Sequence, residues 1–182
     1  MLQLKLYGLG GQGVVTAAKV LASAIAIQEG RYAQAVPAYG HERRGAPVYA
    51  DLIVDDEPIL VKSFVYQPDY VLIFDLAVIE KGVNVTEGAH KNTCFVANSD
   101  KAPIEYPFSQ GFGPVYYADA TKIALEVLNI EIPNSAMLGA FAATGVVKID
   151  SVCAALQEFF QGKAGDKNVE AARRCYTSIQ RL

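Results

Sequence analysis

A glycine-rich turn set between a strand pattern and a helix pattern constrains the fold more than any other feature of the sequence. Leu2 to Tyr7 alternates apolar and polar side chains, as a half-buried strand does. The glycine-rich turn follows, and then Val14 to Gln28 has the apolar content of a buried helix, which Gly30 can end. This order of elements is typical of the first unit of a Rossmann-like α/β fold.

The spacing of the glycines predicts that the turn binds an anion. Gly8, Gly10 and Gly13 match the pattern G-x-G-x-x-G after a strand and before a helix. In this pattern the first glycine permits the tight turn, the second admits a ligand to the backbone, and the third allows close helix packing. Because free N–H groups and the helix dipole favour an anion, we predict a phosphate site that also includes Gly11 and Gln12.

Neighbouring residues argue against the two commonest nucleotide motifs. A dinucleotide fingerprint needs an acidic residue about 20 positions further on, and Tyr32 to Tyr39 has none. A P-loop needs Lys and Ser or Thr after its last glycine, where this chain has Val14 and Val15. The alternative is that the glycines only form a close turn in a packed sheet.

The rest of the chain predicts a three-layer α/β/α domain with a mixed sheet. Val48 to Val54 alternates as a strand, and Ile59 to Val65 can return beside it as a hairpin. Tyr70 to Phe74 is apolar on both faces, as a central parallel strand is, and Asp75 follows at its carboxyl end. Further strands are expected at 32–36, 93–97 and 115–118, and helices at 119–128, 134–144, 150–160 and 168–181. We predict one domain over residues 1–182.

Composition excludes several classes of partner. The net charge is -3 and the basic residues are spread along the chain, so we expect no nucleic acid as a partner. Apolar runs such as Ala17 to Ile27 contain charged or polar residues and are shorter than the roughly 20 residues of a membrane span. The amino terminus lacks a signal-peptide pattern. We therefore expect a soluble, cytoplasmic protein.

Few side chains are suited to catalysis or metal binding. Cys94, Cys153 and Cys175 are widely spaced, which is typical of reduced thiols and does not provide the four ligands that an iron–sulfur cluster takes. His41 and His90 are isolated in the sequence. We therefore assign no metal ligand and no catalytic residue to this chain.

A second candidate for ligand binding is the charged loop Ala38-Tyr39-Gly40-His41-Glu42-Arg43-Arg44-Gly45-Ala46-Pro47. The guanidinium of Arg44 suits bidentate recognition of a phosphate or carboxylate, and Glu42 can orient it. We expect this loop at the carboxyl end of the sheet, beside the glycine turn. The alternative is a solvated surface loop with a local ion pair.

The two segments together resemble a known family, the gamma subunits of 2-oxoacid:ferredoxin oxidoreductases. The resemblance rests on 8–19 and 39–48, continues through 56–59 and 68–72, and includes the late segment Asn134-Ser135-Ala136-Met137-Leu138-Gly139-Ala140. It extends over almost the whole chain. The form Arg43-Arg44-Gly45-Ala46-Pro47 is closer to members acting on pyruvate or related short oxoacids.

The resemblance implies a role in anaerobic metabolism within a larger enzyme. The family's complexes convert a 2-oxoacid, coenzyme A and oxidised ferredoxin to acyl-CoA, carbon dioxide and reduced ferredoxin. Companion alpha, beta and delta-type subunits would carry thiamine diphosphate, Mg and the iron–sulfur clusters, and ferredoxin would be reached through the complex. Coenzyme A would be the co-substrate whose phosphate the glycine turn could bind. The isolated chain would be inactive.

Two alternatives remain open at this point. The chain can be a stand-alone domain that binds NAD(P) or another nucleotide, or a purely structural subunit whose turn meets no ligand. Crystals soaked with nucleotide test the first, and titration of an assembled complex with coenzyme A tests the second.

Overall fold

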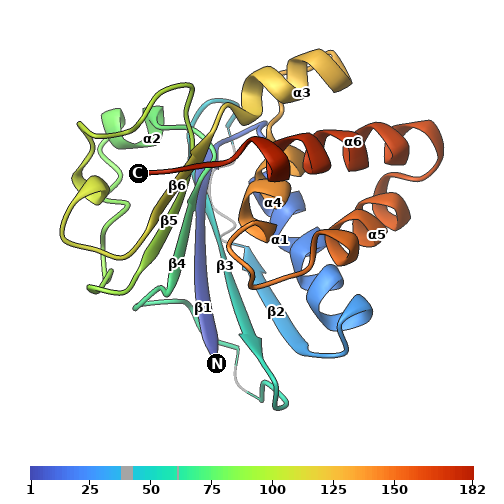
Figure 1. Ribbon diagram of the computed structural model, residues 1–182. Helices are drawn as coiled ribbons and strands as arrows, with labels where there is room; N and C mark the ends of the chain where they lie inside the picture. Colours follow the sequence, from blue (N-terminus) through green and yellow to red (C-terminus); the bar gives the residue numbers. More distant parts are fainter. Residues whose placement is uncertain (38–42, 61) are drawn as a thin grey trace.

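The fold is built on a mixed sheet, seen in a computed structural model that describes residues 1–37, 43–60 and 62–182. Within these residues the sheet has seven strands in the order β2-β3-β1-β4-β5-β6-β7 (Figure 1). The strands are β1 (Leu2–Leu9), β2 (Tyr32–Pro37), β3 (Pro47–Asp55), β4 (Tyr70–Ile73), β5 (Cys94–Asn98), β6 (Val115–Ala118) and β7 (Gln180–Arg181). Strands β1, β4, β5 and β6 run parallel, whereas β3 and β7 run antiparallel to their neighbours, which confirms the predicted mixed sheet.

The central strands are buried on both faces because their sequences are apolar throughout. In β4, Val71, Leu72 and Ile73 are fully buried. Strand β4 pairs on one side with β1 and on the other with β5, so it lies in the interior of the sheet. The prediction of a central parallel strand is confirmed, and Phe74 continues its buried run.

Helices cover one face of the sheet (Figure 1). They are α1 (Val14–Ser23), its π-helical continuation η1 (Ala24–Gln28), α3 (Ala120–Leu128), α4 (Asn134–Ala142), α5 (Ile149–Phe160) and α6 (Gly162–Ser178). Every residue of α4 is buried. Gly139 allows α4 to approach α6 closely, since a Cβ at this position would contact the backbone of Ala172. In the described ranges, no helix has both the length and the apolarity needed to cross a bilayer.

The opposite face has a thinner cover. It consists of the short helix α2 (Ala77–Glu80), the 3-10 turn η2 (Pro107–Ser109) and connecting loops. Phe95 and Phe108 stack beneath it with ring centroids 5.2 Å apart. The predicted α/β class is confirmed, with one covering layer formed mainly by loops.

The predicted hairpin from Ile59 to Val65 is wrong. Strand β3 already has β1 on one side and β2 on the other, so both of its edges are paired. In its described part the segment forms no strand. The N–H of Val65 instead donates to Oδ2 of Asp51 at 2.9 Å, which ties the segment to the face of the sheet.

The predicted start and end of one helix also differ from the structure. Helix α6 begins at Gly162 rather than Asn168, and it ends at Ser178. Ile179 is extended, and β7 then adds an edge strand to β6. The helical periodicity continued past the true end because an edge strand of two residues is too short to show its own pattern. The predicted cap of α3 is confirmed, since Asp119 accepts a hydrogen bond from the N–H of Lys122 at 2.9 Å.

Candidate functional site

The glycine turn lies at the carboxyl end of β1, where open α/β sheets place ligand sites. Gly8 brings strand and helix together, because a Cβ there would lie 2.5 Å from Cγ2 of Val14 and 3.0 Å from Cβ of Phe74. Gly11 and Gly13 both have positive φ angles, of 98° and 73°. These are left-handed conformations that side chains rarely adopt, so the turn depends on glycine at both positions.

Gly13 also accommodates a residue from a distant segment. A Cβ at Gly13 would lie 2.5 Å from Nδ2 of Asn134, the first residue of α4. Asn134 is buried, and its Oδ1 accepts a hydrogen bond from the N–H of Ser135 at 2.8 Å. The amide nitrogen of Asn134 therefore lies against the turn. Asn134 lies in the segment that carries the resemblance, but it was not predicted as a site residue.

Gly10 has a use that the sequence did not predict. The space of its missing Cβ is taken by the carbonyl of Arg43. Two backbone hydrogen bonds hold the same contact, from the N–H of Gly10 to the oxygen of Ala46 at 2.8 Å and from the N–H of Gly45 to the oxygen of Gly10 at 2.9 Å. Gly10 thus admits the charged loop to the backbone, in the place where the pattern suggested a ligand.

These contacts confirm the predicted position of the described part of the charged loop, beside the glycine turn. Arg44 is exposed, and its Cγ lies 3.7 Å from the position of a Cβ on Gly11. The side chain of Arg44 therefore starts over the turn. Glu42, expected to orient Arg44, lies outside the described residues, so its part in the site stays a prediction.

Gln12 joins the turn to the neighbouring parallel strand. Its Oε1 accepts a hydrogen bond from the N–H of Leu9 at 2.8 Å, and its Nε2 donates to Oδ2 of Asp75 at 2.6 Å. Asp75 in turn accepts a hydrogen bond from the N–H of Ala77 at 2.9 Å through Oδ1. Gln12 is therefore engaged in holding the carboxyl ends of β1 and β4 together.

The start of α1 retains unused hydrogen-bond donors. Within the described part of the chain, the N–H groups of Gly11, Gly13 and Val14 donate to no protein acceptor. Gly13 occupies the N-cap position without a side-chain cap, and the first turn of α1 contains no acidic residue. Free N–H groups at the positive end of a helix dipole favour a bound anion.

The three cysteines are poor nucleophiles. Cys94, Cys153 and Cys175 are free and buried. Burial raises the pKa of the Cys94 thiol, and likewise that of Cys175, to about 12. It also raises the pKa of Cys153. Thiols with such pKa values stay protonated near neutral pH, so they react slowly.

The fold and the turn define a class: a Rossmann-like α/β domain with free backbone donors at its first helix. Comparison with known proteins specifies it further. Residues 3–178 match the family model described as pyruvate ferredoxin/flavodoxin oxidoreductase. The chain is 44% identical to pyruvate synthase subunit PorC of Methanocaldococcus jannaschii, over 98% of this chain and 97% of that protein.

Two further proteins are similar over nearly the whole chain. The common subunit gamma of the pyruvate/ketoisovalerate oxidoreductases of Thermococcus kodakarensis is 44% identical over 97% of this chain and 96% of its own. The crystal structure of pyruvate oxidoreductase subunit PORC from Thermotoga maritima has a TM-score of 0.85 and 32% identity, covering 99% of this chain and 97% of its own. This chain belongs to the pyruvate ferredoxin/flavodoxin oxidoreductase family, which confirms the predicted gamma-type subunit of a 2-oxoacid:ferredoxin oxidoreductase.

Proposed function

We propose that this subunit holds the phosphate-bearing end of coenzyme A at the glycine turn, while companion subunits carry out the redox chemistry. The observation that carries the proposal is the set of N–H groups on Gly11, Gly13 and Val14 at the start of α1, which donate to no acceptor among the described residues. Asn134 adds an amide donor from α4, and Arg44 adds a positive charge above Gly11. Gly8, Gly10 and Gln12 support the turn through packing and hydrogen bonds, and Glu42 would orient Arg44.

The substrate of the whole complex would be pyruvate or a related short 2-oxoacid. One relative is named as the common gamma subunit of two oxidoreductases that differ in their oxoacid. A subunit shared in this way is better suited to binding what both reactions have in common than to selecting the oxoacid. The family resemblance implies that both oxidoreductases use coenzyme A. This shared co-substrate supports the assignment of coenzyme A binding to this chain.

The remaining parts of the assembly belong to the same proposal. Alpha, beta and delta-type subunits would carry thiamine diphosphate, Mg and the iron–sulfur clusters, and would transfer electrons to ferredoxin in the cytoplasm. The low reactivity expected of the three buried thiols supports placing the chemistry elsewhere.

One observation favours the alternative of a purely structural subunit. Gly10 and Gln12 are already used in contacts within the chain. Calorimetric titration of the assembled complex with coenzyme A and with pantetheine, which lacks the nucleotide phosphates, distinguishes the two. If the turn holds phosphate, pantetheine binds at least about tenfold more weakly. Equal affinities of the complex for coenzyme A and pantetheine would support the structural alternative. So would equal affinities of the parent complex and an Arg44→Ala complex for coenzyme A.

A further inference from the structure

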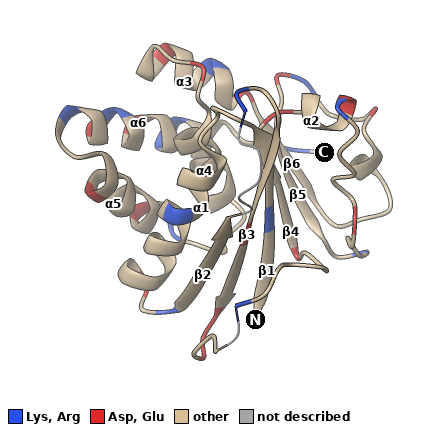
Figure 2. Ribbon diagram, turned by 180° about the vertical axis from the view of Figure 1, so that it is seen from behind, with Lys and Arg blue, Asp and Glu red and all other residues tan. Residues whose placement is uncertain are grey.

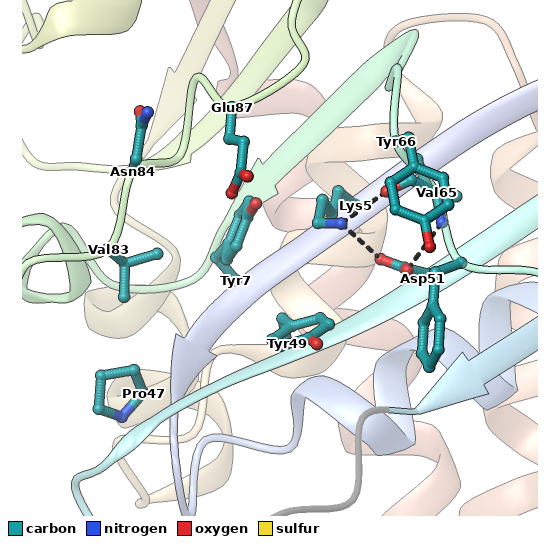
Figure 3. Close-up of a pocket in the computed structure, with 11 residues that line it drawn as sticks. Lys5, Tyr7, Pro47, Tyr49, Asp51, Val65, Tyr66, Val83, Asn84 and Glu87 are labelled. Carbon is teal, nitrogen blue, oxygen red and sulfur yellow. Dashed lines mark hydrogen bonds and ion pairs between the residues drawn. The ribbon is translucent and has the colours of Figure 1, made fainter.

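A cavity of about 540 Å³ lies on the face of the sheet opposite the helices (Figure 3). Its floor consists of two cross-strand pairs of β1 and β3, Lys5 with Asp51 and Tyr7 with Tyr49. Their neighbours along the strands, such as Leu6, belong to the helix-covered core. Because side chains alternate along a strand, these four residues face the other way.

The floor contains a buried carboxylate whose charge is incompletely compensated. Asp51 is fully buried, and within the described residues its Oδ1 has no hydrogen-bond partner. The ammonium of Lys5 lies 3.5 Å from Oδ1 but donates its short hydrogen bond, of 2.7 Å, to the carbonyl of Val65. A buried polar atom without a partner is costly, so the floor carries uncompensated negative charge. The ammonium of Lys5 also lies 5.4 Å from the ring centroid of Tyr49.

A second carboxylate stands over the cavity. Glu87 comes from the loop that follows α2, and Figure 3 shows its carboxylate beside the hydroxyl of Tyr7. Burial, followed by the charge of Glu87, raises the pKa of Tyr7. No ion pair involves Glu87 among the residues that the structure describes. Two carboxylates thus face one ammonium, so a cation fits the cavity better than an anion.

The rim of the cavity is aromatic and exposed. Tyr66 is 75% exposed and Phe64 is 49% exposed, although both are large and Phe64 is wholly apolar. Both line the cavity together with Tyr49. Exposed aromatic groups mark protein interfaces, and a planar guanidinium binds both ring faces and carboxylates. Acidic and basic side chains are interspersed elsewhere over the described chain (Figure 2).

We propose that this cavity is a docking site for an arginine side chain of a companion subunit, whose guanidinium pairs with the exposed carboxylate of Glu87 at the mouth of the cavity. The inference rests on the proposed function, because it takes the chain as one subunit of a larger enzyme. Arginine is favoured over lysine because its planar guanidinium can form a bidentate pair with one carboxylate and stack on a tyrosine ring.

The test compares two matched variants of the full chain. Glu87→Gln removes the exposed charge at the cavity and keeps the shape, whereas Glu170→Gln removes an exposed charge from α6 in the helix layer. Biolayer interferometry measures the affinity of each for the purified companion subunits at low and high salt. We expect Glu87→Gln to weaken binding by about tenfold at low salt and less at high salt, and Glu170→Gln to bind as the parent does.

A cross-linking arm identifies the occupant. A photo-reactive benzoylphenylalanine in place of Tyr66 should cross-link to a companion peptide that contains arginine. A charge reversal then tests the pair: Glu87→Lys should weaken binding, and changing the companion arginine to Glu should restore it. Parental affinity of Glu87→Gln, or cross-links to no companion peptide, would overturn the docking inference. If the Glu87→Gln chain binds its companions normally and the complex oxidises pyruvate, only the docking inference fails. If the parent chain does not bind the companions at all, the proposed function fails with it.

Discussion

Replacing Gly13 by alanine tests whether the turn and α4 are joined as the structure shows. The residue has a φ angle of 73°, and its Cβ would lie 2.5 Å from Nδ2 and 3.1 Å from Cβ of Asn134. Two separate penalties should therefore add in Gly13→Ala. One is the left-handed backbone, and the other is overlap with a buried side chain.

The magnitude follows from these two penalties. An alanine in the left-handed region costs about 1 kcal/mol. Overpacking against a buried neighbour adds about 2 kcal/mol. Gly13→Ala should therefore lower the free energy of unfolding by about 3 kcal/mol. Gly82 is a matched control, because it has a φ angle of 86° and nothing within 4 Å of its Cβ position. Gly82→Ala should cost only the backbone penalty of about 1 kcal/mol.

Urea unfolding of the chain, followed by circular dichroism, measures these differences. The double variant Gly13→Ala with Asn134→Ala isolates the contact, since Asn134→Ala removes the two atoms closest to the new Cβ. We expect this pair to recover about 1 to 2 kcal/mol relative to the sum of the single variants. Equal costs of Gly13→Ala and Gly82→Ala, or additive effects in the double variant, would refute the contact between the turn and α4.

Three shorter predictions concern activity, ligand binding and pH. The isolated chain should not reduce a viologen dye with pyruvate and coenzyme A, whereas adding the companion subunits should restore activity. Arg44→Lys keeps the charge but loses one hydrogen bond of a bidentate pair, so the KM for coenzyme A should rise about fivefold with assembly intact; an unchanged KM would remove Arg44 from the site. Burial raises the pKa of Asp51 above its ordinary value of 3.8. Between the pKa of the unfolded state and the higher pKa of the folded state, only the folded state keeps the proton. The contribution of Asp51 to the free energy of unfolding therefore falls as pH rises through this interval. Relative to the parent, Asp51→Asn should become more stable over that interval in pH-dependent urea melts, and a constant difference would contradict the assignment.

The parts of the fold that were predicted correctly have strong local patterns. The run from Tyr70 to Phe74 is apolar at every position and is short, as is typical of a strand covered on both faces. The end of β1 was predicted for the same kind of reason, because glycines at fixed spacing mark a turn between strand and helix. Asp119 caps α3 because its side chain can reach the free N–H groups of the first turn.

The errors come from features that depend on distant parts of the chain. The segment ending at Val65 was predicted as a strand because a turn precedes it. In the structure, β2 pairs with the edge of β3 where this segment was expected. Long-range pairing decides such competition, and no local pattern records it. Asn134 was missed for a similar reason, because its contact with Gly13 joins positions over a hundred residues apart. A signal was available in the resemblance segment that begins with Asn134, but the sequence gives no indication of which face of α4 meets the turn.

The same long-range contacts make a last prediction about the assembled enzyme. The N–H groups of Gly11 and Gly13 lie between Asn134 on α4 and the described part of the charged loop, which is fixed through Gly10. A phosphate bound there would contact all three segments, so it should stabilise them together by about 2.7 kcal/mol at a hundredfold excess over Kd. Hydrogen exchange measured on the complex with coenzyme A should show slower exchange at 10–16, 43–46 and 134–138, with no change on the far strand β7. Protection confined to companion subunits would place coenzyme A elsewhere and leave the glycine turn as a packing device.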